Sequence, residues 1–300
     1  MNASITPSIT PLVTRPWDGY ALLDSGHGRK LEKYGKVTVD RPEPQALWSP
    51  TLPQSEWDKA HARFTNTGDE DGDSGKWVLN KDCPESWEVN WEGVKFICRL
   101  MSFRHMGLFP EQLTHWNWVS NKIKSADRQL NILNLFAYTG AATLAAAKDG
   151  AQVTHLDASK KAIQWGKDNQ AASGLTEAPI RWICDDAKAF VAREIRRGRK
   201  YDGIILDPPK FGRGPDGERW QIEEDLPDLL ANCAALLSDT PSFMILTAYA
   251  MRLSSVSLAA TLSDVLKDKG GKIDSGELLI EQVNGNRFLS TSLFARWELK

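Results

Sequence analysis

The sequence has no long hydrophobic run and no closely paired cysteines. No stretch of its 300 residues approaches about eighteen consecutive apolar residues, and the opening MNASITPSITPLVTRPWDGY lacks a basic start and a sustained apolar run. These absences argue against a membrane span and a Sec-type signal peptide. The four cysteines (Cys83, Cys98, Cys184 and Cys233) form no CxxC pair, which gives no zinc signature and favours a reducing compartment. We therefore expect a cytoplasmic protein without a bound metal.

The sequence also lacks a strong excess of one charge. Its formal net charge is −2, so no global electrostatic argument favours nucleic acid, although a local basic patch remains open. Hydrophobic residues make up 41% and charged residues 25%, as in ordinary soluble proteins, and the length predicts two domains or one large α/β unit. Eight of the twelve tryptophans lie between Trp17 and Trp118. This uneven distribution indicates that the first third is a separate structural unit.

Four segments follow from the pattern of turns and apolar runs. Residues 1–16 hold three prolines among Ser and Thr without periodicity, which predicts a flexible leader. Residues 17–103 break into short runs, among them two alternating segments joined at Glu92-Gly93, and predict a small β-rich domain. Residues 104–128 predict a helical linker, and residues 129–300 a larger domain.

Apolar strands alternate with helical windows without a break after residue 129. NILNLF, QVTHLD, PIRWIC, YDGIILD and SFMILTAY are typical of buried strands, and the chain closes with a predicted hairpin around Asn284-Gly285. Such alternation predicts right-handed βαβ units and an open, mostly parallel sheet, with ligands at the carboxyl ends of the strands.

Polar residues stand where four consecutive strands end. Gly140 follows the first strand, Asp157 ends the second roughly twenty residues later, Asp186 follows the third and Asp207 ends the fourth. A single glycine in place of GxGxxG weakens an NAD or FAD interpretation. The pattern favours a nucleoside-binding crevice, and the alternative is a packing glycine with acids that only cap helices.

Three segments carry a family resemblance. NLFAYTGAATLAAAKDGAQVTHLDASKKAI, IRWICDDAKAFV and IILDPPKFGRG together resemble class I S-adenosylmethionine-dependent methyltransferases of the bacterial rRNA large-subunit methyltransferase-like family, and the resemblance extends from Phe103 to about Tyr249. No segment resembles the PUA-like RNA-binding module of some relatives. The resemblance implies a Rossmann-like seven-stranded sheet of order 3-2-1-4-5-7-6, S-adenosylmethionine as cofactor and S-adenosylhomocysteine as product.

The resemblance also implies cofactor roles. Gly140 and its neighbours would contact the methionine portion and the ribose, and Asp157 would hold the ribose hydroxyls. Asp186 would hold the adenine amino group; its alternative role is the N-cap of the following helix, which Asp185 could provide instead. Asp207 would lie beside the methionine ammonium and the target atom. The predicted cofactor set comprises Phe109 and Gln112, which close over the cofactor from the linker, with Phe136, Tyr138, Thr139, Gly140, Ala141, Asp157, Ala158, Asp185, Asp186 and Asp207.

The predicted catalytic segment is Asp207-Pro208-Pro209-Lys210-Phe211. Two prolines fix φ and remove two amide donors, so the carbonyls of Asp207 and Pro208 are free to face a bound group. In amino-group methyltransferases a similar turn accepts hydrogen bonds from an exocyclic amine while an aromatic ring, here Phe211, stacks on the base. The alternative is a rigid turn without a chemical role.

The acceptor is the least determined part of the interpretation. Methylation at carbon 5 of a pyrimidine requires a Cys nucleophile. The segments directly after the fourth and fifth strands contain no Cys, and Cys233 falls in the middle of a predicted helix, so a nitrogen or oxygen of an RNA base is favoured. Predicted substrate contacts are His105, Arg213 and Arg219. The acidic loop Asp69–Asp73 suits a protein or small-molecule acceptor equally well. Two different functions also remain open: a nucleotide-dependent oxidoreductase, and an RNA-binding assembly factor with a vestigial cofactor fold.

Overall fold

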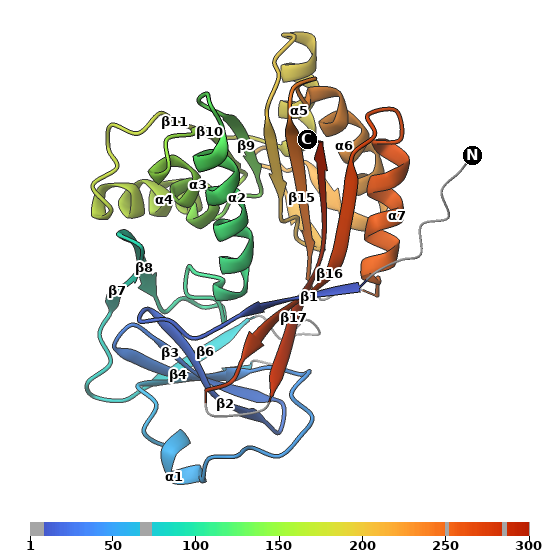
Figure 1. Cartoon of the computed structure of the whole chain (residues 1–300). Coiled ribbons are helices and arrows are strands. Elements are labelled where there is room, and N and C mark those ends of the chain that lie inside the picture. Colours follow the sequence, from blue (N-terminus) through green and yellow to red (C-terminus); the bar gives the residue numbers. More distant parts are fainter. Residues whose placement is uncertain (1–8, 67–73, 250–251, 284–286, 300) are drawn as a thin grey trace.

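The protein has an N-terminal β-rich lobe and a larger α/β lobe (Figure 1). The computed structural model describes residues 9–66, 74–249, 252–283 and 287–299. The predicted turn at Asn284-Gly285 and the acidic loop Asp69–Asp73 lie outside these residues. No helix within the described ranges is long and apolar enough to cross a membrane.

The α/β lobe is built on an eight-stranded sheet of order β1-β16-β17-β15-β12-β9-β10-β11. Its strands are β1 (Ile9–Thr14), β9 (Asn131–Leu135), β10 (Gln152–Asp157), β11 (Ile180–Cys184), β12 (Gly203–Leu206), β15 (Ser242–Ala248), β16 (Lys272–Glu281) and β17 (Phe288–Leu299). Counted from β11 to β16, seven strands follow the predicted order 3-2-1-4-5-7-6, which is confirmed. β17 is antiparallel to both of its neighbours, and the other pairings are parallel.

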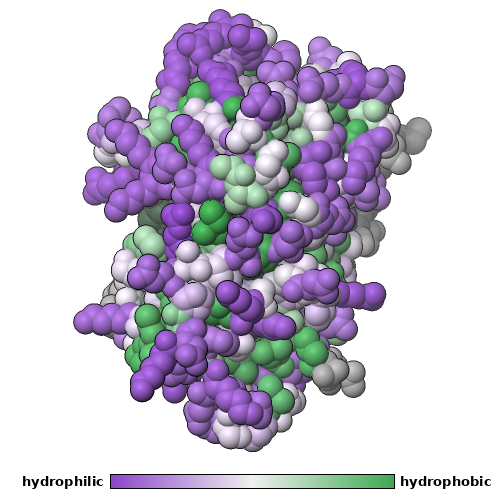
Figure 2. All heavy atoms as spheres, turned by 90° about the vertical axis from the view of Figure 1, so that its left-hand side faces the viewer, coloured by the Kyte–Doolittle hydropathy of each residue, from purple (hydrophilic) through white to green (hydrophobic). Residues whose placement is uncertain are grey.

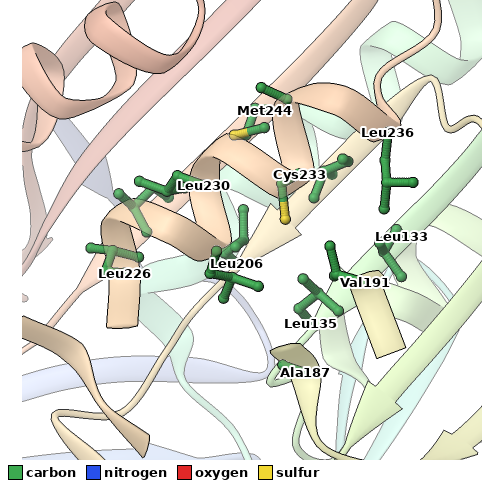
Figure 3. Close-up of a cluster of buried hydrophobic side chains, with 14 of the residues drawn as sticks. Leu133, Leu135, Ala187, Val191, Leu206, Leu226, Leu230, Cys233, Leu236 and Met244 are labelled. Atoms are coloured by element: carbon green, nitrogen blue, oxygen red, sulfur yellow. The ribbon is translucent and has the colours of Figure 1, made fainter. Parts of the chain in front are cut away.

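Helices cover both faces of this sheet because its strands are apolar on both sides. On one face, Leu133 and Leu135 of β9 belong to a buried cluster with residues of α5, α6 and α7, and Figure 3 shows them near Val191 and Cys233. On the other face, Ile132 packs with α2 and α3. Alternate residues of one strand thus enter two cores, as expected for a buried parallel sheet. The helices are α2 (Leu113–Ser125), α3 (Ala141–Lys148), α4 (Lys160–Ala172), α5 (Ala187–Arg196), α6 (Ile222–Leu236) and α7 (Ser255–Val265).

The N-terminus differs from the sequence prediction. Residues 1–16 were expected to be a flexible leader, but Ile9–Thr14 form β1, which pairs in parallel with β16. Pro11 argued against a strand, yet β1 lies at the edge of the sheet, where a missing N–H is tolerated. The Thr10 hydroxyl also donates to Asp274 Oδ1 at 2.8 Å and ties β1 to β16.

The N-terminal lobe contains a five-stranded sheet of order β2-β3-β4-β5-β6 and a separate β7-β8 hairpin. The hairpin turns at Glu92-Gly93 as predicted, and both residues have positive φ. Its β8 strand contacts α4, since Asn169 accepts from the Ile97 amide at 2.8 Å. The lobe comprises β2 (Tyr20–Gly26), β3 (Arg29–Tyr34), β4 (Val37–Pro42), α1 (Gln54–Trp57), β5 (Ala62–Asn66), β6 (Gly75–Leu79), β7 (Ser86–Trp91) and β8 (Val94–Arg99).

Two further connections join the lobes. Gln282, just after β16, forms a bridge with Leu22 and donates to Asp24 at 3.0 Å, so the long β16–β17 hairpin reaches the N-terminal lobe (Figure 1). The linker adds a short 3-10 helix, η1 (Pro110–Gln112), before α2.

Figure 2 shows that the side seen at the left of Figure 1 is mostly hydrophilic, with small hydrophobic patches.

Candidate active site

The four polar strand ends meet at one edge of the sheet. β12, β9, β10 and β11 are neighbours and all parallel, so their carboxyl ends point the same way. This arrangement brings the Gly140 turn, Asp157, Asp186 and Asp207 to one edge, as the strand pattern predicted. It is the edge at which open α/β sheets bind ligands.

The turn after β9 has an unusual backbone. Phe136 and Tyr138 have φ of 55° and 48°, and Gly140, at 85°, precedes Ala141, the first residue of α3. Left-handed φ values at non-glycine residues are costly and cluster at functional sites. The Tyr138 amide donates to Asp157 Oδ2 at 2.8 Å, so the acid of β10 holds this turn in place.

Asp157 is not the cap of the following helix. Its Oδ1 accepts from the Ser159 amide at 2.8 Å, and the Ser159 side chain caps α4 instead. Burial raises the pKa of Asp157, against the two amide hydrogen bonds that lower it. Because each carboxylate oxygen can accept more than one hydrogen bond, Asp157 keeps capacity for further donors such as hydroxyls.

In the pair after β11, Asp186 has the capping role that the sequence left open as its alternative. Asp186, and not Asp185, caps α5, because its Oδ1 accepts from the Ala189 amide at 2.9 Å. Asp185 instead pairs with Arg193. Asp is among the residues preferred at the position directly before a helix. One carboxylate oxygen of Asp186 is therefore occupied by the cap. Ala158 lies between the two strand ends, where its carbonyl faces Cys184 Sγ at 3.5 Å.

The linker reaches the same edge of the sheet. Gln112 Nε2 donates to Asp207 Oδ2 at 3.0 Å. The Phe109 ring lies 5.8 Å from Tyr138 and 4.9 Å from His105, measured between ring centroids. A further tie comes from Thr139, whose hydroxyl donates to the Gly107 carbonyl at 2.5 Å.

Asp207 has the most perturbed carboxyl group of the edge. Burial and the negative charge of Glu111 raise the pKa of Asp207 to about 7, against the Gln112 hydrogen bond, which lowers it. No cationic side chain within the described residues pairs with Asp207. The carboxyl is therefore suited to receive a cation or to exchange a proton near neutral pH.

The segment after Asp207 is a turn followed by a hairpin, where the sequence indicated only a loop. Strands β13 (Phe211–Arg213) and β14 (Arg219–Gln221) pair with Arg213 opposite Arg219. Trp220 Nε1 donates to the Pro209 carbonyl at 2.7 Å. Phe211 is 53% exposed and lies beneath Lys210, whose Nζ is 5.0 Å from the ring centroid. The hairpin lines a hollow of about 370 Å³.

The cysteines lie away from this edge of the sheet or have thiols whose pKa is raised, which makes them poor nucleophiles. Cys233 is fully buried among leucines of α6 and its neighbours, and burial raises its pKa (Figure 3). Burial also raises the pKa of Cys184, which lies nearest the edge. A thiolate nucleophile requires a lowered pKa. No group of three potential metal ligands occurs within the ranges that the structure describes.

Sequence reasoning missed two groups. Asn134 and His155 stand as polar residues inside otherwise apolar strands, a signal that could have identified them, and both are buried close to the Gly140 turn. Glu111, buried in η1, raises the pKa of Asp207, and no pattern in the surrounding sequence indicates this role.

Comparisons with known proteins agree with this geometry. The family model for S-adenosylmethionine-dependent methyltransferases matches residues 55–255. The chain belongs to this methyltransferase family. A SAM-dependent methyltransferase from Agrobacterium tumefaciens is 48% identical, with a TM-score of 0.93 over 97% of this chain and 94% of its own. A Streptococcus mutans protein described as a SAM-dependent methyltransferase shares the fold at 17% identity, with a TM-score of 0.71 over 93% and 75% of the two chains.

Curated relatives match a smaller region of the methyltransferase. The Ribosomal RNA large subunit methyltransferase K/L of Shewanella frigidimarina is 35% identical over 148 residues, which is 49% of this chain and 20% of that protein. The related protein of Alteromonas mediterranea is 32% identical over 157 residues, 52% of this chain and 21% of its own length. The chain thus spans about a fifth of the length of these relatives.

The residues of the edge fit S-adenosylmethionine, the cofactor of this family. The cofactor carries hydroxyls, an ammonium and a sulfonium. Asp157 offers acceptor capacity for hydroxyls, and Asp207 is a partly buried carboxyl that lacks a cationic partner in the described part of the chain. A bound cation would compensate the charge of Asp207, whose ionised form is otherwise disfavoured by burial.

Proposed function

We propose that this methyltransferase transfers a methyl group to a nitrogen or oxygen of an RNA base, with ribosomal RNA as the first candidate, and without a Cys nucleophile. The observation that carries the proposal is Asp207, a carboxyl with a pKa of about 7 at the end of β12, followed by a proline turn and the exposed ring of Phe211. The printed names of the curated relatives support rRNA. The four free thiols fit the reducing cytoplasm, where such an RNA would be met.

For the cofactor, we assign each part to a strand end. The Tyr138–Ala141 turn would hold the methionine portion, Asp157 the ribose hydroxyls, and the free oxygen of Asp186 the adenine amino group. Phe109 and Gln112 would cover it from the linker. When bound, the cofactor supplies a methyl group already activated by its sulfonium.

The remaining chemical demand is positioning and proton removal. The main-chain carbonyls of Asp207 and Pro208 would face the acceptor, and Phe211 offers an exposed ring on which a planar base could stack. Asp207 Oδ2 is held by Gln112, so Oδ1 is the oxygen available to accept the proton that leaves the acceptor atom. Asp207 would thus act as the base that takes up this proton when the acceptor atom receives the methyl group. His105, Arg213 and Arg219 would contact the rest of the substrate.

The acceptor can be tested directly. We would compare modified nucleosides by mass spectrometry in rRNA and tRNA from cells with and without the gene, and then restore the missing mark with purified enzyme. One methylated nucleoside should disappear and return. Asp207→Asn should fail to restore it, whereas Asp216→Asn, the same change in the exposed hairpin turn, should restore it fully.

Two outcomes would redirect the proposal. Unchanged RNA together with methyl incorporation into protein or a metabolite would reject RNA as the acceptor. Loss of turnover on changing a single Cys, with cofactor binding intact, would instead support a covalent mechanism at carbon 5 of a pyrimidine.

A further inference from the structure

A row of side chains crosses the buried sheet below the Gly140 turn. His155 of β10 is directly opposite Asn134 of β9 and Trp182 of β11 in the strand register. Asn134 and His155 are 3% and 0% exposed. The centroids of the His155 and Trp182 rings are 4.3 Å apart. Polar groups in such a position cost free energy unless hydrogen bonds compensate them, so the row calls for an explanation.

Hydrogen bonds link the members of this row. Asn134 Nδ2 donates to Thr143 Oγ1 at 3.0 Å, and Thr143 Oγ1 lies 2.9 Å from His155 Nδ1, to which its hydroxyl hydrogen can be donated. Burial lowers the pKa of His155 to about 3, so the ring is neutral at physiological pH. If Nδ1 accepts the Thr143 hydroxyl hydrogen, the proton of the neutral ring resides on Nε2.

The His155 ring lies against the turn that we assign to the cofactor. Its Nε2 is buried without a hydrogen-bond partner among the described residues, and the main chain of Tyr138 interacts with the ring so as to favour its protonated form. A Cβ atom at Gly140 would lie 3.5 Å from the His155 ring and 3.3 Å from Trp182. The two rings therefore form the floor of the turn.

The Tyr138 peptide is consequently held from two sides. Its N–H donates to Asp157, two residues beyond His155 on the same strand, and its φ of 48° is one that a tyrosine rarely adopts. A strained conformation persists only where the surroundings impose it. Asp157 holds the Tyr138 amide, and the His155 ring packs against the turn at Gly140.

We propose that His155, fixed as the Nε2-protonated tautomer by Asn134 and Thr143, is a positioning residue that holds the Tyr138–Gly140 turn in the conformation that receives the cofactor. The inference rests on the proposed function, because it takes this turn as the cofactor site. His155 acts through the turn, and needs no contact with the cofactor.

The test measures S-adenosylhomocysteine binding by calorimetry with the full chain. His155→Leu should raise the Kd about tenfold, equal to about 1.4 kcal/mol. His155→Gln should retain binding within about threefold, since its amide can accept from Thr143 and donate toward the turn. Thr143→Val, nearly isosteric, should raise the Kd about threefold to tenfold by removing the hydroxyl that sets the tautomer.

A matched control separates positioning from general destabilisation. Thr154→Val makes the same change in β10, one residue from His155 and on the opposite face of the sheet, and should leave the Kd unchanged even if it lowers the melting temperature. Nitrogen NMR of His155 should show the Nε2-protonated tautomer throughout about pH 5 to 8, and a mixture in Thr143→Val.

The outcomes are distinct for the two proposals. If Asp157→Ala leaves the Kd unchanged, the cofactor-site assignment fails. If Asp157→Ala weakens binding while His155→Leu and Thr143→Val bind as tightly as the wild type, or Thr154→Val weakens it equally, the positioning role of His155 is wrong. Failure of His155→Leu to fold leaves Thr143→Val as the deciding variant.

Discussion

Asp207→Asn should stabilise the protein, increasingly so as the pH rises. The pKa of Asp207 is raised from 3.8 to about 7 by burial and by Glu111. Between these two values the folded state holds a proton that the unfolded state has released. The contribution of Asp207 to the free energy of unfolding is therefore largest at low pH, and is lost as the pH rises through about 7.

The magnitude follows from the two pKa values. Between pH 5 and pH 8, linkage gives a loss of about 2.5 kcal/mol from this one group in the wild type. Asn cannot ionise and can still accept the hydrogen bond from Gln112. The difference in unfolding free energy between Asp207→Asn and wild type should grow by up to about 2.5 kcal/mol over this range.

The assay is urea unfolding of both proteins at several pH values. The wild type alone is uninformative, because burial lowers the pKa values of His115 and His155 to about 3, and these groups make stability rise with pH over the same window. Subtracting the two curves removes that contribution. Glu111→Gln should shrink the pH-dependent difference by lowering the pKa of Asp207. Parallel curves for Asp207→Asn and wild type would refute the reasoning.

Three further outcomes are expected. Asp157→Ala should weaken S-adenosylhomocysteine binding by about 1–3 kcal/mol in calorimetry, because hydrogen bonds to the cofactor are lost; an unchanged Kd contradicts this. Gly140→Ala should lower unfolding free energy by about 1 kcal/mol or more, since its φ of 85° disfavours a side chain that would also meet Trp182; equal stability in urea would argue against it. Replacing all four cysteines with Ser or Ala, in a folded variant, should leave methyl transfer measurable by isotope incorporation.

Much of the α/β lobe could be predicted because its strands are long apolar runs separated by helical periodicity. NILNLF, QVTHLD and PIRWIC each formed the expected strand, and their order placed the acids at one edge. β1 could not be predicted in the same way. Its partner β16 lies some 260 residues away, and a proline-containing segment becomes a strand only through an edge position that the tertiary fold supplies.

The candidate site was predictable where chemistry and chain position coincide. Asp157 and Asp207 end strands, so their placement followed from the topology. The separate roles of Asp185 and Asp186 could not be predicted, because either acid could cap α5; in the structure Asp186 caps it and Asp185 pairs with Arg193. The role of Glu111 could not be predicted either, since its effect on Asp207 arises because the linker lies close to the end of β12 in the folded protein.

The N-terminal lobe contributes charge to this edge as well as shape. Burial raises the pKa of Glu111, while Lys30 of β3 and Arg41 of β4 lower it and so favour its carboxylate form. That carboxylate in turn raises the pKa of Asp207. Arg41 also donates to the Arg104 carbonyl at 3.3 Å, and the Arg104 guanidinium lies 5.4 Å from the ring centroid of Tyr249, directly after β15. The pKa of Asp207 is thus raised by burial and by Glu111 of the linker, and Lys30 and Arg41 of the N-terminal lobe act on it only through Glu111.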